Sequence, residues 1–343
     1  MPNSTNTVLF EAEVLPGLER FAVSELRRRL VGANFFVPQS GGVPFSYPGP
    51  MSDLASPRTV TAVYQVLRLD VPRPKAFLGH QVFTRIVSSI RSIIGGQAGF
   101  RTLSLDAAGA DSAVMLRVKR ELALAVGLEE TSEKGDLHIR VRRTKESDSW
   151  DILIRLTPRP LATRSWRIHN FQGALNAAVA AAMADMTTPA EGDSVLNLCC
   201  GSGSLVIERA FRTSSRLLIG VDNDSRVLQL ANEHLEAAML SDARLICGDV
   251  TELPLPSSAF DVLLADIPFG QLVGSHQVNK KLYPALMKEA ARVACRGARF
   301  ALITHEKRLI GDVIAAQSAW TVHDRIPVNL NGLHPDILVL RRE

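Results

Sequence analysis

The region from residue 171 to residue 343 alternates short apolar segments with longer amphipathic ones, and this alternation constrains the fold more than any other feature. The apolar segments have the length of strands, and the segments between them carry apolar residues at helical spacing. Such alternation predicts an α/β domain with a doubly wound, mainly parallel sheet. Ligands of such sheets bind at the carboxyl ends of the strands, so we expect the chemistry there.

Seven strands and four helices are predicted in this region. The strands are expected at residues 194–199, 217–221, 243–247, 262–265, 299–304, 320–328 and 337–340. The helices are expected at 204–211, 227–239, 279–294 and 307–315. A polar connector that carries arginines, residues 161–170, precedes them.

The first 160 residues predict two smaller α+β regions. Residues 8–30 read as a strand, a turn at Pro16-Gly17 and an amphipathic helix. Residues 38–57 are rich in Pro, Gly and Ser and predict a long loop. The second region is expected to have strands at 60–69, 101–106, 137–143 and 150–156, and helices at 79–94 and 112–125. A chain of 343 residues has room for two or three domains.

Composition places the chain among ordinary folded proteins. The hydrophobic fraction is 46% and the charged fraction 22%, which excludes disordered and fibrous classes. The longest apolar stretch, residues 173–186, is too short to cross a bilayer, and the N-terminus has no signal pattern, so we expect a cytoplasmic protein without a membrane role. The cysteines lack metal-ligand spacing and predict reduced thiols and no metal site: Cys199, Cys200, Cys247 and Cys295.

Positive charge is concentrated locally. The formal net charge is only +4, but residues 140–167 carry eight Arg and Lys against three Asp and Glu. Concentrated cations suit a polyanionic partner, because neutralised phosphates release counterions. A solvated strand face has the same composition, so both interpretations stay open on charge alone.

The first chemical motif is a glycine-bearing turn, Asn197-Leu198-Cys199-Cys200-Gly201-Ser202-Gly203-Ser204, between the first strand and the first helix of the α/β domain. Glycines let the backbone approach a ligand, and the helix start offers unpaired N–H groups. Asp222 ends the next strand about twenty residues later, where a carboxylate can accept both hydroxyls of a ribose. The pair predicts a nucleoside cofactor.

NAD and S-adenosylmethionine both fit this pair, and two residues favour the second. A dinucleotide motif requires a small residue at position 206, where this chain has Val206. Asp249, at the end of the third strand, is placed to accept a hydrogen bond from the adenine amine. Isolated aspartates at such positions are usually turn formers, but two at successive strand ends favour a ligand site.

The second motif is Asp266-Ile267-Pro268-Phe269-Gly270, directly after the fourth strand. Alone it would be a turn. At this strand end it resembles the D/N-x-P-Y/F motif of methyltransferases that modify amino groups on bases. An exocyclic amine is a poor nucleophile, and hydrogen bonds to the Asp266 carboxylate and the Ile267 carbonyl would restore electron density at its nitrogen. Pro268 would fix the backbone, and Phe269 would stack on the base.

The chain resembles the THUMP-domain tRNA (guanine-N2) methyltransferases of the bacterial TrmN-like kind. The resemblance lies in the Asp266 motif and the segments around it, and it covers nearly the whole chain. The further segments are Phe10 to Glu19, Arg159 to Arg167, Gly173 to Asn176, Gly274 to His276, Asn279, and Leu282 to Pro284.

The resemblance implies four regions. They are an N-terminal ferredoxin-like domain (1–58), a THUMP domain (59–160), a linker (161–170) and a Rossmann-fold methyltransferase domain (171–343). It further implies that the N-terminal regions hold tRNA by its 3′ end while the last domain methylates a guanine of the acceptor stem, at tRNA position 6. The guanine must leave its helix, at a cost of about a few kcal/mol.

The site residues follow from the motifs and the resemblance. The expected catalytic residues are Asp266, Ile267, Pro268 and Phe269. The expected S-adenosylmethionine contacts are Ala174, Leu175, Asn197, Cys199, Gly201, Ser202, Gly203, Asp222, Asn223, Gly248, Asp249, Val250 and Asp266. The expected RNA contacts are Arg140, Arg142, Arg143, Arg164, Arg167, His276, Lys280 and Lys281, with Asn279 beside them as a further phosphate contact.

The chain departs from the family pattern at Asn197, where relatives usually begin the turn with Asp-Pro, and at Ser204, where they carry Thr. A neutral Asn197 weakens any attraction for the cofactor's ammonium group. Two alternatives stay open: an amino-methyltransferase of DNA or ribosomal RNA, and an inactive RNA-binding homologue. A small activator subunit is also not excluded.

Overall fold

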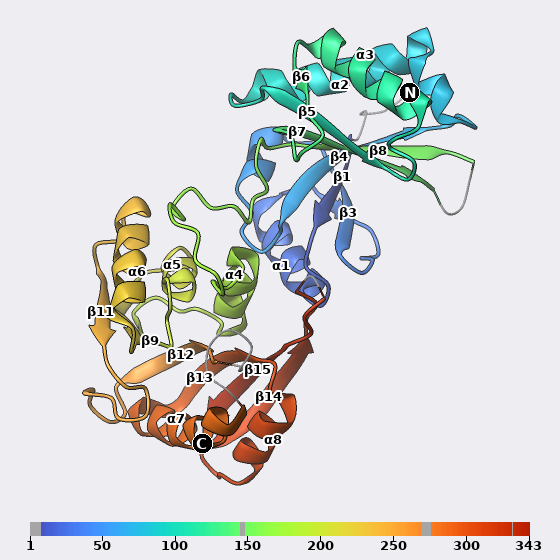
Figure 1. The fold of residues 1–343 in the computed structure, drawn as a ribbon. Coiled ribbons are helices and arrows are strands. Elements are labelled where there is room, and N and C mark those ends of the chain that lie inside the picture. The colour runs from blue at the N-terminus through green and yellow to red at the C-terminus, as the bar shows by residue number, and fades with distance from the viewer. Residues whose placement is uncertain (1–7, 145–147, 269–275, 331) are drawn as a thin grey trace. The chain divides into compact units, whose positions relative to one another are not determined.

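The structure is a computed structural model that describes residues 8–144, 148–268, 276–330 and 332–343. It consists of two compact units. The first comprises the chain up to Val14 together with Ala22–Ala162, and the second comprises Leu15–Phe21 together with Thr163–Glu343. Each unit is built around one sheet (Figure 1).

In the first unit the described strands form one sheet with the order β2-β3-β1-β4-β8-β7-β5-β6. Neighbours run antiparallel, except that β5 is parallel to both β6 and β7. The strands are β1 (Val8–Glu13), β2 (Asn34–Phe35), β3 (Gly42–Tyr47), β4 (Ala62–Leu69), β5 (Thr102–Ala107), β6 (Glu129–Glu130), β7 (Leu137–Arg143) and β8 (Trp150–Arg155). The strands of the two predicted N-terminal regions therefore share a sheet.

Two helices, α2 and α3, lie together over one face of this sheet (Figure 1). Local sequence explains the ends of α3. The Ser112 side chain caps its first turn by accepting a hydrogen bond from the Met115 N–H, and Gly127 ends it in the left-handed conformation at φ 71°. The helices of this part of the chain are α1 (Glu19–Arg29), η1 (Met51–Ala55), η2 (Pro74–Leu78), α2 (His80–Gly96) and α3 (Ala113–Val126).

The long loop predicted at residues 38–57 is wrong. This segment contains strand β3, paired with β1, and the short helix η1. Val43 and Phe45 in β3 are fully buried, so the strand is held by its apolar face. The Pro, Gly and Ser residues that suggested a loop mostly flank these two elements. Composition over twenty residues hid a six-residue strand.

In the second unit the described strands form one seven-stranded sheet with the order β11-β10-β9-β12-β13-β15-β14. The first five strands are parallel, and β15 pairs antiparallel with β13 and β14. The strands are β9 (Asp193–Leu198), β10 (Ser215–Asp222), β11 (Ala243–Cys247), β12 (Phe260–Asp266), β13 (Ala294–Thr304), β14 (Trp320–Pro327) and β15 (Asp336–Arg342). The predicted seven-stranded, mainly parallel sheet is confirmed.

Helices cover both faces of this sheet, with α4, α5 and α6 on one side and α7 and α8 on the other (Figure 1). Leu263, Met287 and Phe300 belong to the apolar core on the side of α7, and all three are fully buried. The helices are α4 (Ala177–Met186), α5 (Ser204–Ala210), α6 (Ser225–Ala237), α7 (His276–Val293) and α8 (Lys307–Ala315).

The apolar stretch at residues 173–186 forms α4, and the Asn176 side chain caps this helix by accepting a hydrogen bond from the Ala178 N–H. Its alanines are fully buried, which explains why it is apolar on all sides. Within the described residues, no helix has the length and hydropathy needed to cross a membrane.

The strand order reverses at β9. The chain proceeds from β9 outward through β10 and β11, then returns to the other side of β9 as β12 and continues to β13. In open parallel sheets such a reversal opens a crevice at the carboxyl ends of the two strands, because the connections leave in opposite directions. The crevice in this unit lies beyond Leu198 and Asp266, where both predicted motifs begin.

Candidate cofactor and catalytic site

The turn after β9 is shaped by residues with positive φ: Cys199 at 50°, Gly201 at 52° and Gly203 at 85°. Glycine is required at 203 for a second reason, because a Cβ there would lie 3.3 Å from the Cβ of Ala231 on α6. The missing side chain lets the start of α5 approach α6 closely.

Asp222, at the end of β10, holds this turn. One carboxylate oxygen, Oδ2, accepts a hydrogen bond of 2.8 Å from the Gly201 N–H, and Oδ1 accepts one of 3.1 Å from the Asp224 N–H. Each carboxylate oxygen has two lone pairs and can accept a second hydrogen bond. Asp222 can therefore shape the glycine turn and also bind the ribose hydroxyls for which it was predicted.

Asp249 follows β11 at the same edge of the sheet. Its Oδ1 accepts hydrogen bonds from the Thr251 N–H, at 2.8 Å, and from the Thr251 hydroxyl, at 2.7 Å. These two bonds lower the pKa of Asp249, so the carboxylate stays ionised. The Gly248 N–H donates to the Asp222 carbonyl at 3.0 Å and joins the ends of β10 and β11.

A cavity of about 350 Å³ opens at this edge. Six of the predicted cofactor residues line it, namely Cys199, Asp222, Asn223, Gly248, Asp249 and Val250. The remaining lining residues are Thr251, Pro268, Val278, Asn279 and Leu282. The cavity thus joins the glycine-turn side of the crevice to the predicted catalytic turn and to α7.

Helix α7 supplies a wall of this cavity through Val278, Asn279 and Leu282. Asn279 is fully buried; its amide nitrogen donates to the Glu306 carboxylate at 3.4 Å, and its Oδ1 has no hydrogen-bond partner among the described residues. A buried polar atom without a partner is costly, so a ligand donor in the cavity would stabilise it. The phosphate contact expected for Asn279 is corrected, because a fully buried side chain does not reach an RNA backbone.

Asp266 ends β12 beside this cavity. No hydrogen bond reaches its carboxylate from any residue that the structure describes, and burial raises its pKa to about 7. The next residue, Ile267, is buried, and its N–H donates to the Ile303 carbonyl of β13 at 3.3 Å. Pro268 lines the cavity. Phe269, the predicted stacking residue, lies outside the described residues.

The other predicted cofactor residues lie around the glycine turn without lining the cavity. Asn197 is fully buried, and its Nδ2 donates to the Leu198 and Leu264 carbonyls, both at 3.1 Å, so it joins β9 to β12. The Ser202 carbonyl contacts the His234 imidazole at 3.0 Å. Two of these residues, Gly201 and Gly203, offer a ligand only their backbone. Ala174 offers its backbone and a methyl group. The Leu175 carbonyl accepts a hydrogen bond from Arg167 at 2.8 Å.

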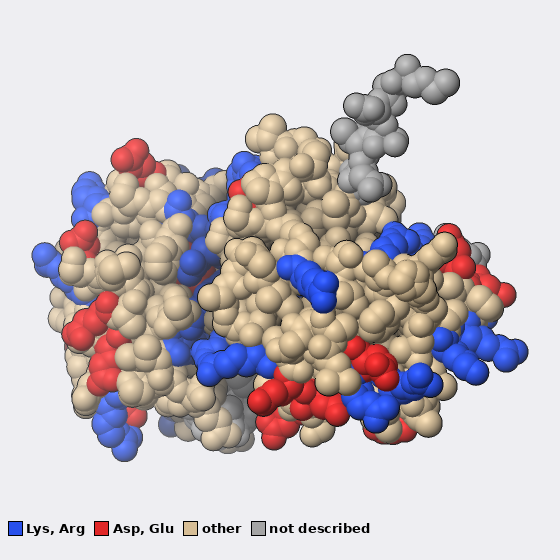
Figure 2. All heavy atoms as spheres, turned by 90° about the horizontal axis from the view of Figure 1, so that it is seen from above, with Lys and Arg blue, Asp and Glu red and all other residues tan. Residues whose placement is uncertain are grey.

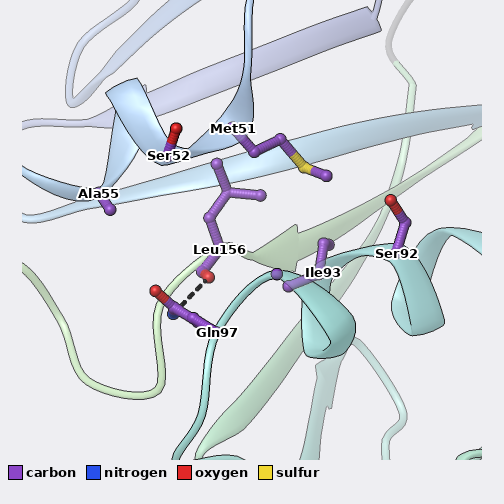
Figure 3. Close-up of a pocket in the computed structure, with 8 residues that line it drawn as sticks. Met51, Ser52, Ala55, Ser92, Ile93, Gln97 and Leu156 are labelled. Atoms are coloured by element: carbon purple, nitrogen blue, oxygen red, sulfur yellow. Dashed lines mark hydrogen bonds between the residues drawn. The ribbon is translucent and has the colours of Figure 1, made fainter.

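Two further cavities are poor candidates for a nucleoside. One of about 510 Å³ lies at the amino ends of β10 and β11, the edge opposite to the motifs, and Arg216 and Arg244 are among its lining residues. The other, in the first unit, holds only about 50 Å³ between η1 and α2, which is room for one or two waters (Figure 3). There the Gln97 amide donates to the Leu156 carbonyl at 2.9 Å.

The predicted RNA contacts on β7 take part in ion pairs within the first unit. Arg140 pairs with Glu13 and lies over the Tyr64 ring at 4.9 Å. Arg142 pairs with both Glu11 and Asp151. These pairs neutralise much of the charge that the sequence concentrates here.

Arg143 stays accessible. It is exposed, and its pair is with the exposed Asp148. On the face of the molecule seen in Figure 2, basic and acidic side chains are likewise interspersed.

Arg164 and Arg167 have internal contacts in the second unit. The Arg164 guanidinium is buried and pairs with Glu208 of α5 at 2.8 Å. Arg167 donates to the Leu175 carbonyl and to the Ser204 hydroxyl, both at 2.8 Å. Both residues therefore fasten the connector to the glycine-turn side of the unit, and the geometry does not support the RNA contacts expected of them.

The cations at the start of α7 are placed differently. Lys280 and Lys281 are exposed. His276 is also exposed, and its Nδ1 contacts the Glu306 carboxylate at 2.9 Å. These side chains remain able to contact an RNA phosphate.

The strand order, the glycine turn and the cavity at the carboxyl ends define a Rossmann-like methyltransferase fold. Among solved structures, TrmN from Thermus thermophilus is similar over 98% of this chain and 100% of that one, with a TM-score of 0.80 and 22% identity. The SMU.472 protein, crystallised in complex with SAH, is similar over 97% of each chain, with a TM-score of 0.70 and 14% identity.

The family model UPF0020, described as the RMKL-like methyltransferase domain, matches residues 164–336, half of the chain. The chain belongs to this family. Its match begins at Arg164, in the connector that the structure assigns to the second unit.

Two curated relatives have named activities. The chain is 28% identical to the tRNA (guanine(6)-N(2))-methyltransferase THUMP3 of Bos taurus over 182 residues, which cover 49% of this chain and 36% of the relative. It is 29% identical to the tRNA (guanine(6)-N2)-methyltransferase of Thermus thermophilus over 206 residues, 60% of each protein. The matched part thus spans between about a third and three fifths of these relatives.

Proposed function

We propose that this protein is an S-adenosylmethionine-dependent tRNA methyltransferase that forms N2-methylguanosine, at position 6 of the acceptor stem. The observation that carries the proposal is the turn that begins at Asp266. An acidic side chain with no hydrogen-bond partner among the described residues ends β12 next to a cavity that has the donors and acceptors of a nucleoside site. The names of the bovine and Thermus relatives support guanine N2 and tRNA as the target.

The cavity residues suit S-adenosylmethionine. Asp222 would accept the ribose hydroxyls, and Asp249, which is ionised, would accept from the adenine amine. Val250 and Leu282 supply apolar walls for the adenine ring. The Oδ1 of Asn279, which has no hydrogen-bond partner in the described part of the chain, offers one more acceptor for a cofactor N–H or O–H group.

The protein would contribute to catalysis by orienting the target amine and by stabilising the charge that develops on it. When bound, S-adenosylmethionine supplies a methyl group activated by a sulfonium centre. The Asp266 carboxylate and the Ile267 carbonyl would accept the two N–H groups of the guanine amine and direct its lone pair toward that methyl group. The nitrogen would become cationic as its new bond to the methyl carbon forms and the methyl–sulfur bond breaks, with S-adenosylhomocysteine as the leaving group, and the carboxylate would stabilise this charge. The surplus amine proton then leaves to Asp266 or to water.

The first unit would hold the tRNA as a ferredoxin-like and THUMP region, divided at about residue 58. The target guanine would have to be flipped from the acceptor stem to reach Asp266. Arg143 in the first unit and Lys280 and Lys281 at the start of α7 are exposed, and these cations would contact phosphates.

The deciding experiment is nucleoside mass spectrometry of unmodified total tRNA incubated with the protein and isotopically labelled S-adenosylmethionine. We expect labelled N2-methylguanosine in tRNA, which digestion and sequencing would map to position 6. Label in DNA or ribosomal RNA but not in tRNA would contradict the proposal. Tight tRNA binding without any label would favour an inactive homologue.

The variant Asp266→Ala tests the mechanism. Removal of the acceptor for the amine should lower kcat by about 100-fold or more and leave the affinity for S-adenosylmethionine nearly unchanged. Asp261→Ala is a matched control, because Asp261 lies on the same strand and accepts a hydrogen bond from the Ser194 N–H away from the cavity. Full activity of Asp266→Ala would remove this mechanism.

A further inference from the structure

Tyr283 is a buried residue of α7 whose hydroxyl contacts the predicted catalytic turn. The hydroxyl donates to the Pro268 carbonyl at 2.7 Å and lies 2.8 Å from the Thr304 hydroxyl. The side chain is fully buried. The Thr304 hydroxyl in turn accepts a hydrogen bond of 3.0 Å from the Glu306 N–H.

The directions of these bonds are determined by proton count. A tyrosine hydroxyl has one proton, and a carbonyl can only accept, so this proton lies between Tyr283 and Pro268. The Thr304 hydroxyl must then donate to the Tyr283 oxygen. The result is a directed chain of hydrogen bonds from the Glu306 amide through Thr304 and Tyr283 to the Pro268 carbonyl, and each bond polarises the next.

Helix and sheet packing place Tyr283 at this point. On α7 the buried residues Asn279, Tyr283, Met287 and Ala290 recur at helical spacing and form one face. Pro284, the next residue, cannot donate a backbone hydrogen bond in the helix. Thr304 ends β13, the strand that pairs with β12. The chain of hydrogen bonds therefore joins α7 to the end of β13 and to the turn that follows β12.

The turn is therefore held from two sides. The Ile267 N–H donates to the Ile303 carbonyl of β13, and the following carbonyl, that of Pro268, accepts from Tyr283. Between these two anchors lies the Ile267 carbonyl, one of the two acceptors assigned to the target amine. A peptide unit that is fixed on both sides cannot rotate, so its carbonyl keeps one direction.

We propose that Tyr283 is a positioning residue that fixes the backbone of the catalytic turn and engages the Pro268 carbonyl, so that Asp266 and Ile267 present the acceptors to the guanine amine. This inference rests on the proposed function. Burial raises the pKa of Tyr283, so its hydroxyl keeps the donated proton throughout the pH range of an assay. A misplacement of about 1 Å at such a site can cost about 100-fold in rate.

The first arm of the test is kinetic and uses the full chain. Tyr283→Phe removes only the hydroxyl and should lower kcat by about 10- to 100-fold, while KM for S-adenosylmethionine changes less than about threefold. Thr304→Val should show a smaller loss of kcat, and Thr304→Ser, which keeps the hydroxyl, should restore most of it.

The control variant is Trp320→Phe. The Trp320 indole N–H donates to the Met287 carbonyl of the same helix at 3.1 Å, away from the turn. Its loss should lower the melting temperature without lowering kcat. An equal loss of kcat in Trp320→Phe and Tyr283→Phe would mean that Tyr283 acts only through stability, and wild-type kcat in Tyr283→Phe would also overturn the proposal.

The second arm does not depend on methyl transfer. Amide hydrogen exchange at Ile267, measured without RNA, should be about tenfold faster in Tyr283→Phe than in the wild type or in Trp320→Phe. If the wild type transfers no methyl group to tRNA, the proposed function fails, but the exchange result still decides whether Tyr283 holds the turn. Unchanged exchange in Tyr283→Phe would refute the positioning role.

Discussion

At the scale of single residues, Asp266 combines two properties that predict a pH-dependent enzyme. It is partly buried, and desolvation raises its pKa to about 7. Only the ionised carboxylate can accept from the amine without offering a proton in return. Since the raised pKa favours the protonated form below pH 7, activity should be lost as the pH falls through this value.

We expect kcat/KM, which reports on the free enzyme, to rise about tenfold per pH unit from pH 5 and to level off above about pH 7. Asp266→Asn should retain little activity and show no such rise, because an amide does not titrate. A wild-type profile that is flat down to pH 5 would contradict a raised pKa of Asp266 in the active protein.

Val206 shows how a residue can be interpreted correctly for one purpose and incompletely for another. It stands where a dinucleotide motif requires a small side chain, which favours S-adenosylmethionine over NAD. In the structure the room for Val206 is made on the strand: a Cβ at Gly220 would lie 3.1 Å from the Val206 side chain. Helix α5 therefore packs closely on the sheet with the large residue, Val206, on the helix and the small one, Gly220, on the strand. Val206 alone is thus weak evidence against NAD.

At the scale of elements, the connector before α4 is part of the second unit rather than a free link. Arg164 pairs with Glu208 inside this unit. Removal of one partner from a buried ion pair leaves an uncompensated charge and typically costs about 3–5 kcal/mol. Arg164→Ala should therefore lower the free energy of unfolding by about this amount, as measured by thermal and urea denaturation.

Arg143→Ala is the matched control for Arg164→Ala, because both arginines were expected to contact RNA. Arg143 pairs with Asp148 on the surface, where ion pairs contribute about 0–1 kcal/mol, so its loss should leave stability unchanged and reduce tRNA affinity in a salt-dependent way. The opposite result, a stable Arg164→Ala protein that has lost tRNA affinity, would show that Arg164 contacts the RNA.

Elements with long, regular periodicity could be predicted from sequence. The helix at residues 307–315 begins and ends as expected, and the strands of the second sheet differ mostly at their ends. Strand β3 could not be predicted, because its six residues contain Gly42, Pro44 and Ser46, and its formation depends on pairing with β1. Sequence patterns describe one element at a time, whereas β3 is stabilised by pairing with residues that lie 29 to 39 positions earlier in the chain.

The candidate site shows the same limit. Asp222, Asp249 and Pro268 lie where a strand ends, and a strand end is visible in the sequence. Asn279 and Tyr283 lie inside α7, and their place at the cavity and the turn follows from how α7 packs against the sheet. The family resemblance included both positions, but it did not predict these contacts. Helical spacing predicts a helix in this segment, but it does not predict which elements pack against that helix.

At the scale of the whole molecule, the second unit includes Leu15–Phe21 from the beginning of the chain. Leu18 is fully buried, and the Asn329 N–H donates to the Pro16 carbonyl at 3.0 Å. Gly17 has φ 102°, and a Cβ there would overlap the Pro327 carbonyl oxygen. This segment therefore packs against the end of β14 through a position that only glycine can fill.

Gly17→Ala should destabilise the second unit by about 2–4 kcal/mol, because it adds a steric clash to an unfavourable φ. Gly32→Ala is the matched control: its φ is 83°, but its Cβ would meet only the Pro48 side chain at 3.6 Å. That change should cost only about 1 kcal/mol. The readout is the melting temperature of the full chain together with S-adenosylmethionine affinity, and equal losses in the two variants would contradict the close contact at Gly17.

The contact between Gly17 and β14 also has a consequence for biosynthesis. Arg20 and Asp324, which form an ion pair at this place, are 304 positions apart in the sequence. Residues 15–21 leave the ribosome long before the strand that receives them has been made. The second unit cannot complete its packing during translation until residues 320–329 have emerged, so its last step closes a very long loop and should be slow.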